Sequence, residues 1–307
     1  MRTLQMSGAT MTKLPLWFIL YSKLHETCLH RDISFCDAQK VLDLSTGHVK
    51  QVMRKLLELK LVVRYTNSLD KRFASYRVVP LSLWSKYRQM EDRLPRALRD
   101  LFPLLLSIPH VHVVLLLGSY VRKDFDRMSD IDVLVVADDP ERVLDITYGA
   151  CSSSSIDLHA CSPEEFRNSL YPLVQHVVLY EDGTCRGKRL SEIERQKLLR
   201  ESLEGAQRIL NLYESGLVGF HNVFPAIYEL VFVDTLLHGS VEQRKPEVLE
   251  RFFQEHSSLR DLRDYMLGLL RIYEKLMKGR GRGVEALGRE KESRIYGRIF
   301  SEVKKHI

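Results

Sequence analysis

The chain has 307 residues, of which 45% are hydrophobic and 28% charged, and its formal net charge is +6. This length suits two or three domains, each with its own core, and the composition is ordinary for a globular protein. No apolar run approaches the ~18 residues of a membrane span, and five scattered cysteines without a Cys-x-x-Cys pair argue against a disulfide framework or zinc site and for a cytoplasmic protein.

The charge is spread unevenly along the chain. Residues 1–100 hold 18 Lys and Arg against 9 Asp and Glu, and residues 271–307 hold 11 against 5. The middle of the chain is acidic, with 17 against 26. Basic ends suit a polyanionic partner, so we expect nucleic acid there.

The first hundred residues show three helical patterns followed by two β patterns. Helices are predicted over residues 14–30, 34–42 and 47–57, and strands over 61–66 and 73–79. In the third helix, Val49, Val52, Met53, Leu56 and Leu57 recur at helical spacing and should face the core.

This element order resembles the winged helix-turn-helix fold of bacterial and archaeal regulators. The resemblance implies that the third helix enters the major groove and that the hairpin lies on the phosphate backbone. The candidate nucleic-acid-binding residues are His48, Lys50, Gln51, Arg54 and Lys55 on the third helix and Lys71 and Arg72 in the hairpin turn. A protein-interaction module is the alternative for this region.

The motif richest in chemistry lies in the middle of the chain. An apolar run ends in Gly118-Ser119, and Asp130 and Asp132 follow within a second apolar run. In a strand, residues two apart point to the same face, so these carboxylates should lie side by side. Paired carboxylates suit Mg²⁺, which usually also binds substrate phosphates, and a glycine lets backbone N–H groups approach a phosphate.

This motif resembles that of the DNA polymerase beta-like nucleotidyltransferase superfamily, and most closely its minimal members. The resemblance implies that Gly118 and Ser119 grip the β- and γ-phosphates, with Arg122 or Lys123 neutralising developing charge. It also implies a third carboxylate on a neighbouring strand, for which Asp157 in the predicted strand 155–161 is the candidate; Asp138 and Asp145 are competitors. Lys123 departs from the usual glycine of the family.

From residue 190 onward the patterns are helical. Runs cover about 191–215, 220–239, 245–256, 259–278 and 284–306, with a glycine-rich linker at 279–283. The segment 223–239 resembles a helix of the HEPN family, which often accompanies minimal nucleotidyltransferases. Arg251 and His256 match the Arg-x4-His spacing of ribonuclease-active HEPN proteins, but we expect this match to arise by chance.

Together these observations predict an α+β multidomain protein with three domains. Residues 1–95 would form the winged helix, 96–189 a small mixed-sheet nucleotidyltransferase domain, and 190–307 an all-α, HEPN-like helical bundle. The expected activity moves a nucleoside monophosphate from an NTP to an acceptor hydroxyl, with pyrophosphate released and two Mg²⁺ ions held by Asp130, Asp132 and Asp157. RNA ends, protein side chains, small molecules and nucleotide messengers all remain compatible acceptors.

A regulator of another class is the alternative function. It would bind nucleic acid and use the nucleotidyltransferase fold as a nucleotide sensor or scaffold. Such a protein need not keep all three acids, so their presence favours the enzyme.

Overall fold

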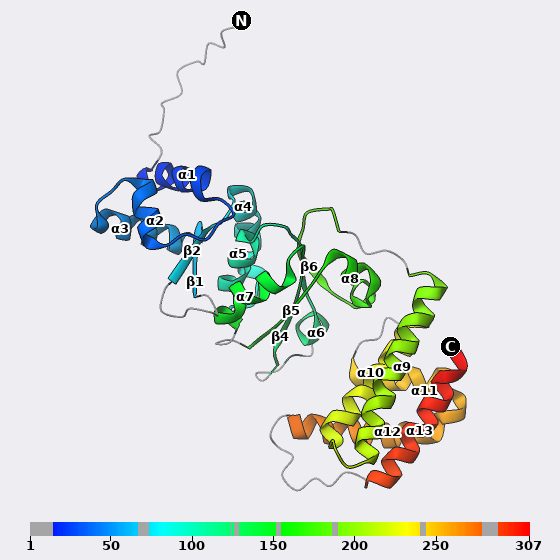
Figure 1. Cartoon of the computed structure of the whole chain (residues 1–307). Coiled ribbons are helices and arrows are strands. Elements are labelled where there is room, and N and C mark those ends of the chain that lie inside the picture. The colour runs from blue at the N-terminus through cyan, green and yellow to red at the C-terminus, as the bar shows by residue number, and fades with distance from the viewer. Residues whose placement is uncertain are drawn as a thin grey trace, which may run out of the picture. The chain divides into compact units, whose positions relative to one another are not determined.

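A computed structural model of the protein describes most of the chain (Figure 1). It divides into two compact units, one of residues 1–111 and 137–160 and the other of residues 112–136 and 161–307. The described residues are 15–66, 74–123, 125, 129–151, 155–185, 190–239, 244–277 and 288–307.

The N-terminal part consists of three helices and a hairpin, at the positions that the sequence predicted. The helices are α1 (Leu16–Cys28), α2 (Phe35–Leu42) and α3 (Thr46–Glu58), and the strands are β1 (Val62–Thr66) and β2 (Ala74–Val78). The strands are antiparallel, with Val62 opposite Val78. Lys71 and Arg72, predicted to bind phosphate at the hairpin turn, lie outside the described residues.

A capping box fixes the start of α2. The Ser34 hydroxyl accepts a hydrogen bond from the backbone N–H of Asp37 at 3.1 Å, and the Asp37 carboxylate accepts one from the N–H of Ser34 at 2.9 Å. The Ser34 hydroxyl also donates to the Asp37 carboxylate at 2.7 Å, and this bond, together with the one from the Ser34 N–H, lowers the pKa of Asp37. The capping box therefore determines the residue at which α2 begins. Helix α2 packs with α1 and α3 around a shared apolar core.

Two helices that were not predicted from the sequence precede the main sheet. These are α4 (Leu81–Met90) and α5 (Leu98–Ser107), with the 3₁₀ helix η1 (Glu91–Arg93) between them. All residues of α5 except Arg99 and Asp100 are buried, and the helix packs against β1 and against α7 (Pro140–Cys151).

The main sheet has four strands in the order β5-β4-β3-β6. Strands β3 and β6 are antiparallel, with Leu116 opposite Val177, and their register shifts between Val114 and Leu115. The inner strands β3 and β4 are apolar and almost wholly buried, as expected for strands covered on both faces. The bounds are β3 (Val111–Leu116), β4 (Ile131–Ala137), β5 (Ile156–Cys161) and β6 (Val177–Glu181).

Short helices follow two of these strands. Helix α6 (Gly118–Arg122) comes directly after β3 and was not predicted, because five residues are too few for a periodic pattern. Helix α8 (Pro163–Asn168) begins at the predicted cap, where Ser162 and Glu165 form a capping box. The 3₁₀ helix η2 (Tyr171–Leu173) then leads to β6.

The last third of the chain is a helical bundle (Figure 1). Helix α9 packs against α10 and α13, while α11 packs against α10 and α12. Their shared core contains Phe224, Phe252, Phe253 and Tyr296, all almost completely buried. The bounds are α9 (Glu192–Glu214), α10 (Phe220–Leu237), α11 (Lys245–Glu255), η3 (Ser257–Leu262), α12 (Arg263–Met277), α13 (Arg289–Val303) and η4 (Lys304–His306).

The glycine-rich linker predicted at 279–283 lies outside the described residues. Within the part of the chain that the structure describes, no helix has both the length and the apolar character to cross a membrane.

Candidate active site and nucleic-acid surface

Gly118 and Asp132 are in direct contact where β3 ends. The N–H of Leu117 donates a hydrogen bond to the carbonyl of Asp132 at 2.9 Å, which sets β3 against the start of β4. Gly118 then turns the chain with a φ of 68°, in the left-handed region that favours glycine. A Cβ built on Gly118 would lie 1.6 Å from Oδ2 of Asp132, so the Asp132 carboxylate occupies the space that any side chain at 118 would need.

The two aspartates of the predicted pair differ in their surroundings. Asp132 is the second residue of β4 and is partly buried, whereas Asp130 comes just before the strand and is exposed. Strand β4 therefore begins at Ile131, one residue later than the prediction that both aspartates lie in the strand requires. Strand ends vary by a residue or two, and both side chains still lie at the same end of β4.

Asp157 lies on β5, a neighbouring strand in the sheet order. It is the second residue of β5, which follows β4 in the strand order, and its exposed carboxylate lies 3.4 Å from the imidazole of His159. Asp138 follows the last residue of β4 and is thus about 20 Å along the strand from Asp132, at ~3.3 Å per residue. Asp145 lies on the exposed side of α7. The assignment of Asp157 as the third carboxylate stays a prediction.

The residues predicted to bind phosphate all lie on or next to α6. Ser119 and Arg122 are in the helix and partly exposed, and Lys123 is its exposed C-cap. Lys123 has a φ of 60°, so it adopts the left-handed conformation that glycine adopts without strain. The lysine at this position therefore strains the backbone, and strain of this kind concentrates at functional sites.

An aromatic pair formed by Tyr120 of α6 and Phe125, just after this helix, was not predicted from the sequence. The rings of Tyr120 and Phe125 are stacked, with centroids 4.4 Å apart and planes 4° from parallel, and Phe125 is half exposed. Exposed aromatic rings are surfaces on which a nucleobase can stack. Neither residue stood out in the sequence, because isolated aromatics are far more often part of a core.

The predicted nucleic-acid-binding face of α3 is exposed. His48, Lys50, Gln51, Arg54 and Lys55 all point to solvent, while Val49, Val52, Met53 and Leu56 are buried as predicted. Leu57, also predicted to be in the core, is only partly buried. Glu58 lies 3.3 Å from Lys55 and 4.0 Å from Arg54 and offsets part of their charge.

Arg251 and His256 have different surroundings. The Arg251 guanidinium is half exposed and donates to Glu255 at 2.6 Å. His256 is 3% exposed and is hydrogen-bonded through Nε2 to the buried carboxylate of Asp234 at 2.8 Å. These contacts account for both side chains as parts of the bundle.

One protein-family model matches the middle of the chain. Residues 92–206 match a family model described as "Nucleotidyltransferase domain". The matched segment contains Gly118, Asp130, Asp132 and Asp157 and extends into α9. A search of curated proteins found no match.

Proposed function

We propose that the protein transfers a nucleoside monophosphate from an NTP to an acceptor hydroxyl and releases pyrophosphate. The contact between Gly118 and Asp132 is the observation that carries this proposal. It combines a side-chain-free backbone turn with a carboxylate directly beside it, inside the segment that matches the nucleotidyltransferase family. A triphosphate and its counter-cation need this combination of close backbone approach and hard oxygen ligands.

The donor set suits magnesium. The carboxylates of Asp130 and Asp132 are hard oxygen ligands, and the space beside Gly118 is filled by one of them rather than by an apolar side chain. Asp130 and Asp132 would hold the ion that accompanies the triphosphate, with Asp157 completing a second site. When bound, Mg²⁺ would supply charge neutralisation at the phosphates and a lower pKa for the acceptor hydroxyl.

The protein's own residues would position the reactants. Backbone N–H groups at Gly118 and Ser119 would orient the β- and γ-phosphates, and Arg122 and Lys123 would stabilise negative charge on the leaving group. The acceptor oxygen would form a bond to the α-phosphorus while the bond from that phosphorus to the β-phosphate oxygen breaks. The hydroxyl proton would leave to solvent and pyrophosphate would depart.

Nucleic-acid binding by the N-terminal part is compatible both with the transferase and with an alternative, nucleotide-sensing regulator. The exposed basic face of α3 supports nucleic-acid binding by the N-terminal part. If the nucleotidyltransferase fold only sensed nucleotides, the protein would be a regulator that binds NTP without turning it over. Turnover of NTP therefore distinguishes a nucleotidyltransferase from a regulator that only senses nucleotides.

The test follows label from NTP into products. Full-length protein is incubated with Mg²⁺ and each of the four α-labelled NTPs, with and without RNA, and label is traced to RNA, protein or small molecules. We expect one acceptor class to become labelled from an α-labelled NTP and to stay unlabelled when the label is on the γ-phosphate. Bound NTP that is recovered intact under every condition would favour the sensor instead.

A further inference from the structure

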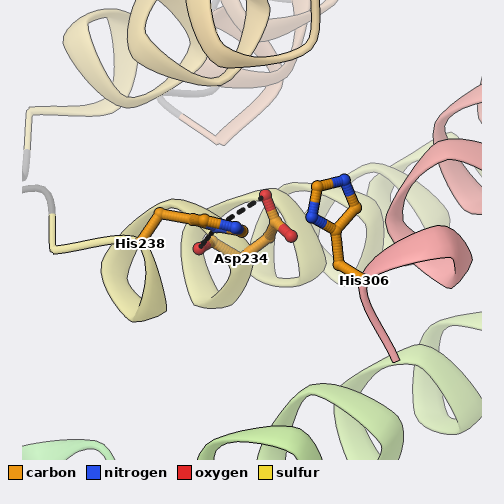
Figure 2. A group of neighbouring side chains, drawn as sticks. All are labelled: Asp234, His238 and His306. Atoms are coloured by element: carbon orange, nitrogen blue, oxygen red, sulfur yellow. Dashed lines mark hydrogen bonds and ion pairs between the residues drawn. The ribbon is translucent and has the colours of Figure 1, made fainter.

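A group of metal-binding side chains lies far in sequence from the nucleotidyltransferase motif. Asp234 and His238 are on the last turn and C-cap of α10, and His306 is on the terminal turn η4. One ligand atom from each residue lies within 4.8 Å of those of the other two. Figure 2 shows the Asp234 carboxylate between the two imidazole rings.

The Asp234 carboxylate is buried and only half satisfied. Its exposed fraction is 0%, and Oδ2 accepts a hydrogen bond from Nε2 of His256 at 2.8 Å. The other oxygen, Oδ1, has no hydrogen-bond partner among the described residues. A buried carboxylate oxygen without a partner is costly, so the arrangement calls for a ligand that supplies positive charge.

His238 is held by the backbone of the same helix. Its Nδ1 lies 2.8 Å from the carbonyl oxygen of Asp234, and since a carbonyl can only accept, Nδ1 carries a proton that it donates. The same Nδ1 lies 3.6 Å from Oδ2 of Asp234. In the tautomer with Nδ1 protonated the lone pair is on Nε2, which is the nitrogen that would bind an ion. A histidine whose one nitrogen donates to a backbone carbonyl is the usual form of a metal ligand.

A second triad shares His306 but fits an ion less well. It comprises His256, Glu302 and His306. Glu302 already accepts a hydrogen bond from Lys305 at 2.5 Å, and His256 donates to Asp234. His256 is thus better placed to orient the Asp234 carboxylate than to bind an ion itself.

We propose that Asp234, His238 and His306 form a binding site for a divalent transition-metal ion of the Zn²⁺ type. Two imidazoles and one carboxylate are donors that Zn²⁺ prefers, whereas Mg²⁺ prefers oxygen alone. The ligand atoms must move inward to reach Zn–N distances of about 2.0–2.1 Å. His238 and His306 are both exposed enough to rotate.

The surroundings leave a place for a fourth ligand. His238 and His306 line a cavity of about 450 Å³, together with Arg195 and Gln196 of α9. A water molecule from this cavity would complete a tetrahedral site. The ion would join the end of α10 to the terminal turn of the chain, whose last residue, Ile307, packs against the bundle core.

The test uses full-length protein without a histidine tag. Zn²⁺ binding is measured by competition with a chromophoric chelator, and Co²⁺ is added separately to record its visible absorption. We expect one tightly bound Zn²⁺ per chain that Mg²⁺ does not displace, a tetrahedral Co²⁺ spectrum, and a higher Tm with Zn²⁺. A protein that binds no Zn²⁺ in this assay would overturn the proposal.

Variants assign the bound ion to this site. His238→Ala and His306→Ala alter exposed side chains and should each weaken Zn²⁺ binding by about 100-fold or more, beyond the ~10–100-fold of a second-shell change. His221→Ala, at the exposed start of the same helix, is the matched control and should bind Zn²⁺ normally. Asp132→Asn should also bind it normally, which separates this site from the nucleotidyltransferase motif. Equal Zn²⁺ affinity in the wild type, His238→Ala and His306→Ala would contradict the proposal.

Discussion

At Gly118 a single methyl group decides whether the turn after β3 can form. We expect Gly118→Ala to lower nucleotidyl transfer about 100-fold, because the added Cβ forces the Asp132 carboxylate out of position and a displacement near 1 Å can cost that much. The φ of 68° adds strain for any side chain. Transfer rates at saturating NTP provide the measurement.

Gly205→Ala on α9 is the matched control for this change. A Cβ at Gly205 would meet nothing within 4 Å, and alanine favours a helix by about 1 kcal/mol over glycine. This variant should keep full transfer and gain stability. Normal transfer by Gly118→Ala would show that the close contact with Asp132 has no catalytic role.

Lys123 tests whether backbone strain is retained at this position because the lysine side chain binds NTP. Lys123→Gly should raise the free energy of unfolding by up to about 1 kcal/mol, because glycine adopts the left-handed conformation without the Cβ clash. The same change should weaken NTP binding, since it removes a positive charge predicted to face phosphate. Denaturant unfolding and NTP titration measure the two effects. Unchanged NTP affinity would remove Lys123 from the site.

Some residues of interest could be predicted from the sequence and others could not. The closeness of Gly118 and Asp132 could be predicted, because a glycine ends one apolar run and an acid opens the next; their roles toward phosphate and metal stay predictions. The stacked Phe125 and the group around Asp234 could not be predicted. Their members meet only after folding, and His306 is 72 residues beyond Asp234 in the chain.

Helix α3 is the element to test for nucleic-acid binding. Changing Lys50, Arg54 and Lys55 together to Ala should weaken duplex binding and lower the slope of log affinity against log salt by up to about 3, at ~0.9 per phosphate contact. NTP binding should stay unchanged. Electrophoretic shift or anisotropy assays over a range of salt concentrations measure the slope.

A charge-matched control lies on α9. Lys197, Arg200 and Arg208 are exposed, and their replacement by Ala removes the same charge from another face. Equal losses in the two triple variants would mean that net charge, rather than α3, attracts nucleic acid. Absence of duplex binding by the wild type would favour a protein partner.

The sheet core can be tested through its cysteines. Burial raises the pKa of Cys161 to about 12 and also raises that of Cys185. At pH 8 only roughly one Cys161 thiol in ten thousand would then be the reactive thiolate. In a Cys36→Ser, Cys151→Ser background, the remaining Cys28, Cys161 and Cys185 are all buried, so a thiol reagent should label them only after unfolding. Rapid labelling of native protein would contradict this packing.

Elements with an apolar repeat or a marked start could be predicted, whereas some short elements could not. Helices α9 to α13 follow apolar repeats over many residues, and capping residues such as Ser162 marked helix starts. Helix α6 and strand β6 have five residues each, too few for a period to stand out. The predicted helical run 259–278 is divided into η3 and α12, a change of geometry that leaves the apolar pattern almost intact.

For the whole molecule, the sequence predicted the order of the parts more readily than their boundaries. Apolar clusters occur within the N-terminal elements and within the bundle, in line with separate cores. The compact units nevertheless follow other boundaries: α7 and most of β5 belong to the unit of the N-terminal elements and most of β4 to the other, since α7 packs with α5 and β1. Periodicity along the chain does not reveal such packing. The division into domains 1–95, 96–189 and 190–307 stays a prediction.

Pyrophosphate release by the wild type and by Asp132→Asn tests the central claim most directly. Both proteins are assayed with Mg²⁺, NTP and the labelled acceptor class, after their Tm values are shown to agree. Asp138→Asn, at the far end of the same strand, is the control. We predict that the wild type and Asp138→Asn release one pyrophosphate for each nucleotide transferred and that Asp132→Asn loses this activity at least about 100-fold. Equal release by Asp132→Asn, or release of inorganic phosphate in place of pyrophosphate, would contradict nucleotidyl transfer at this site.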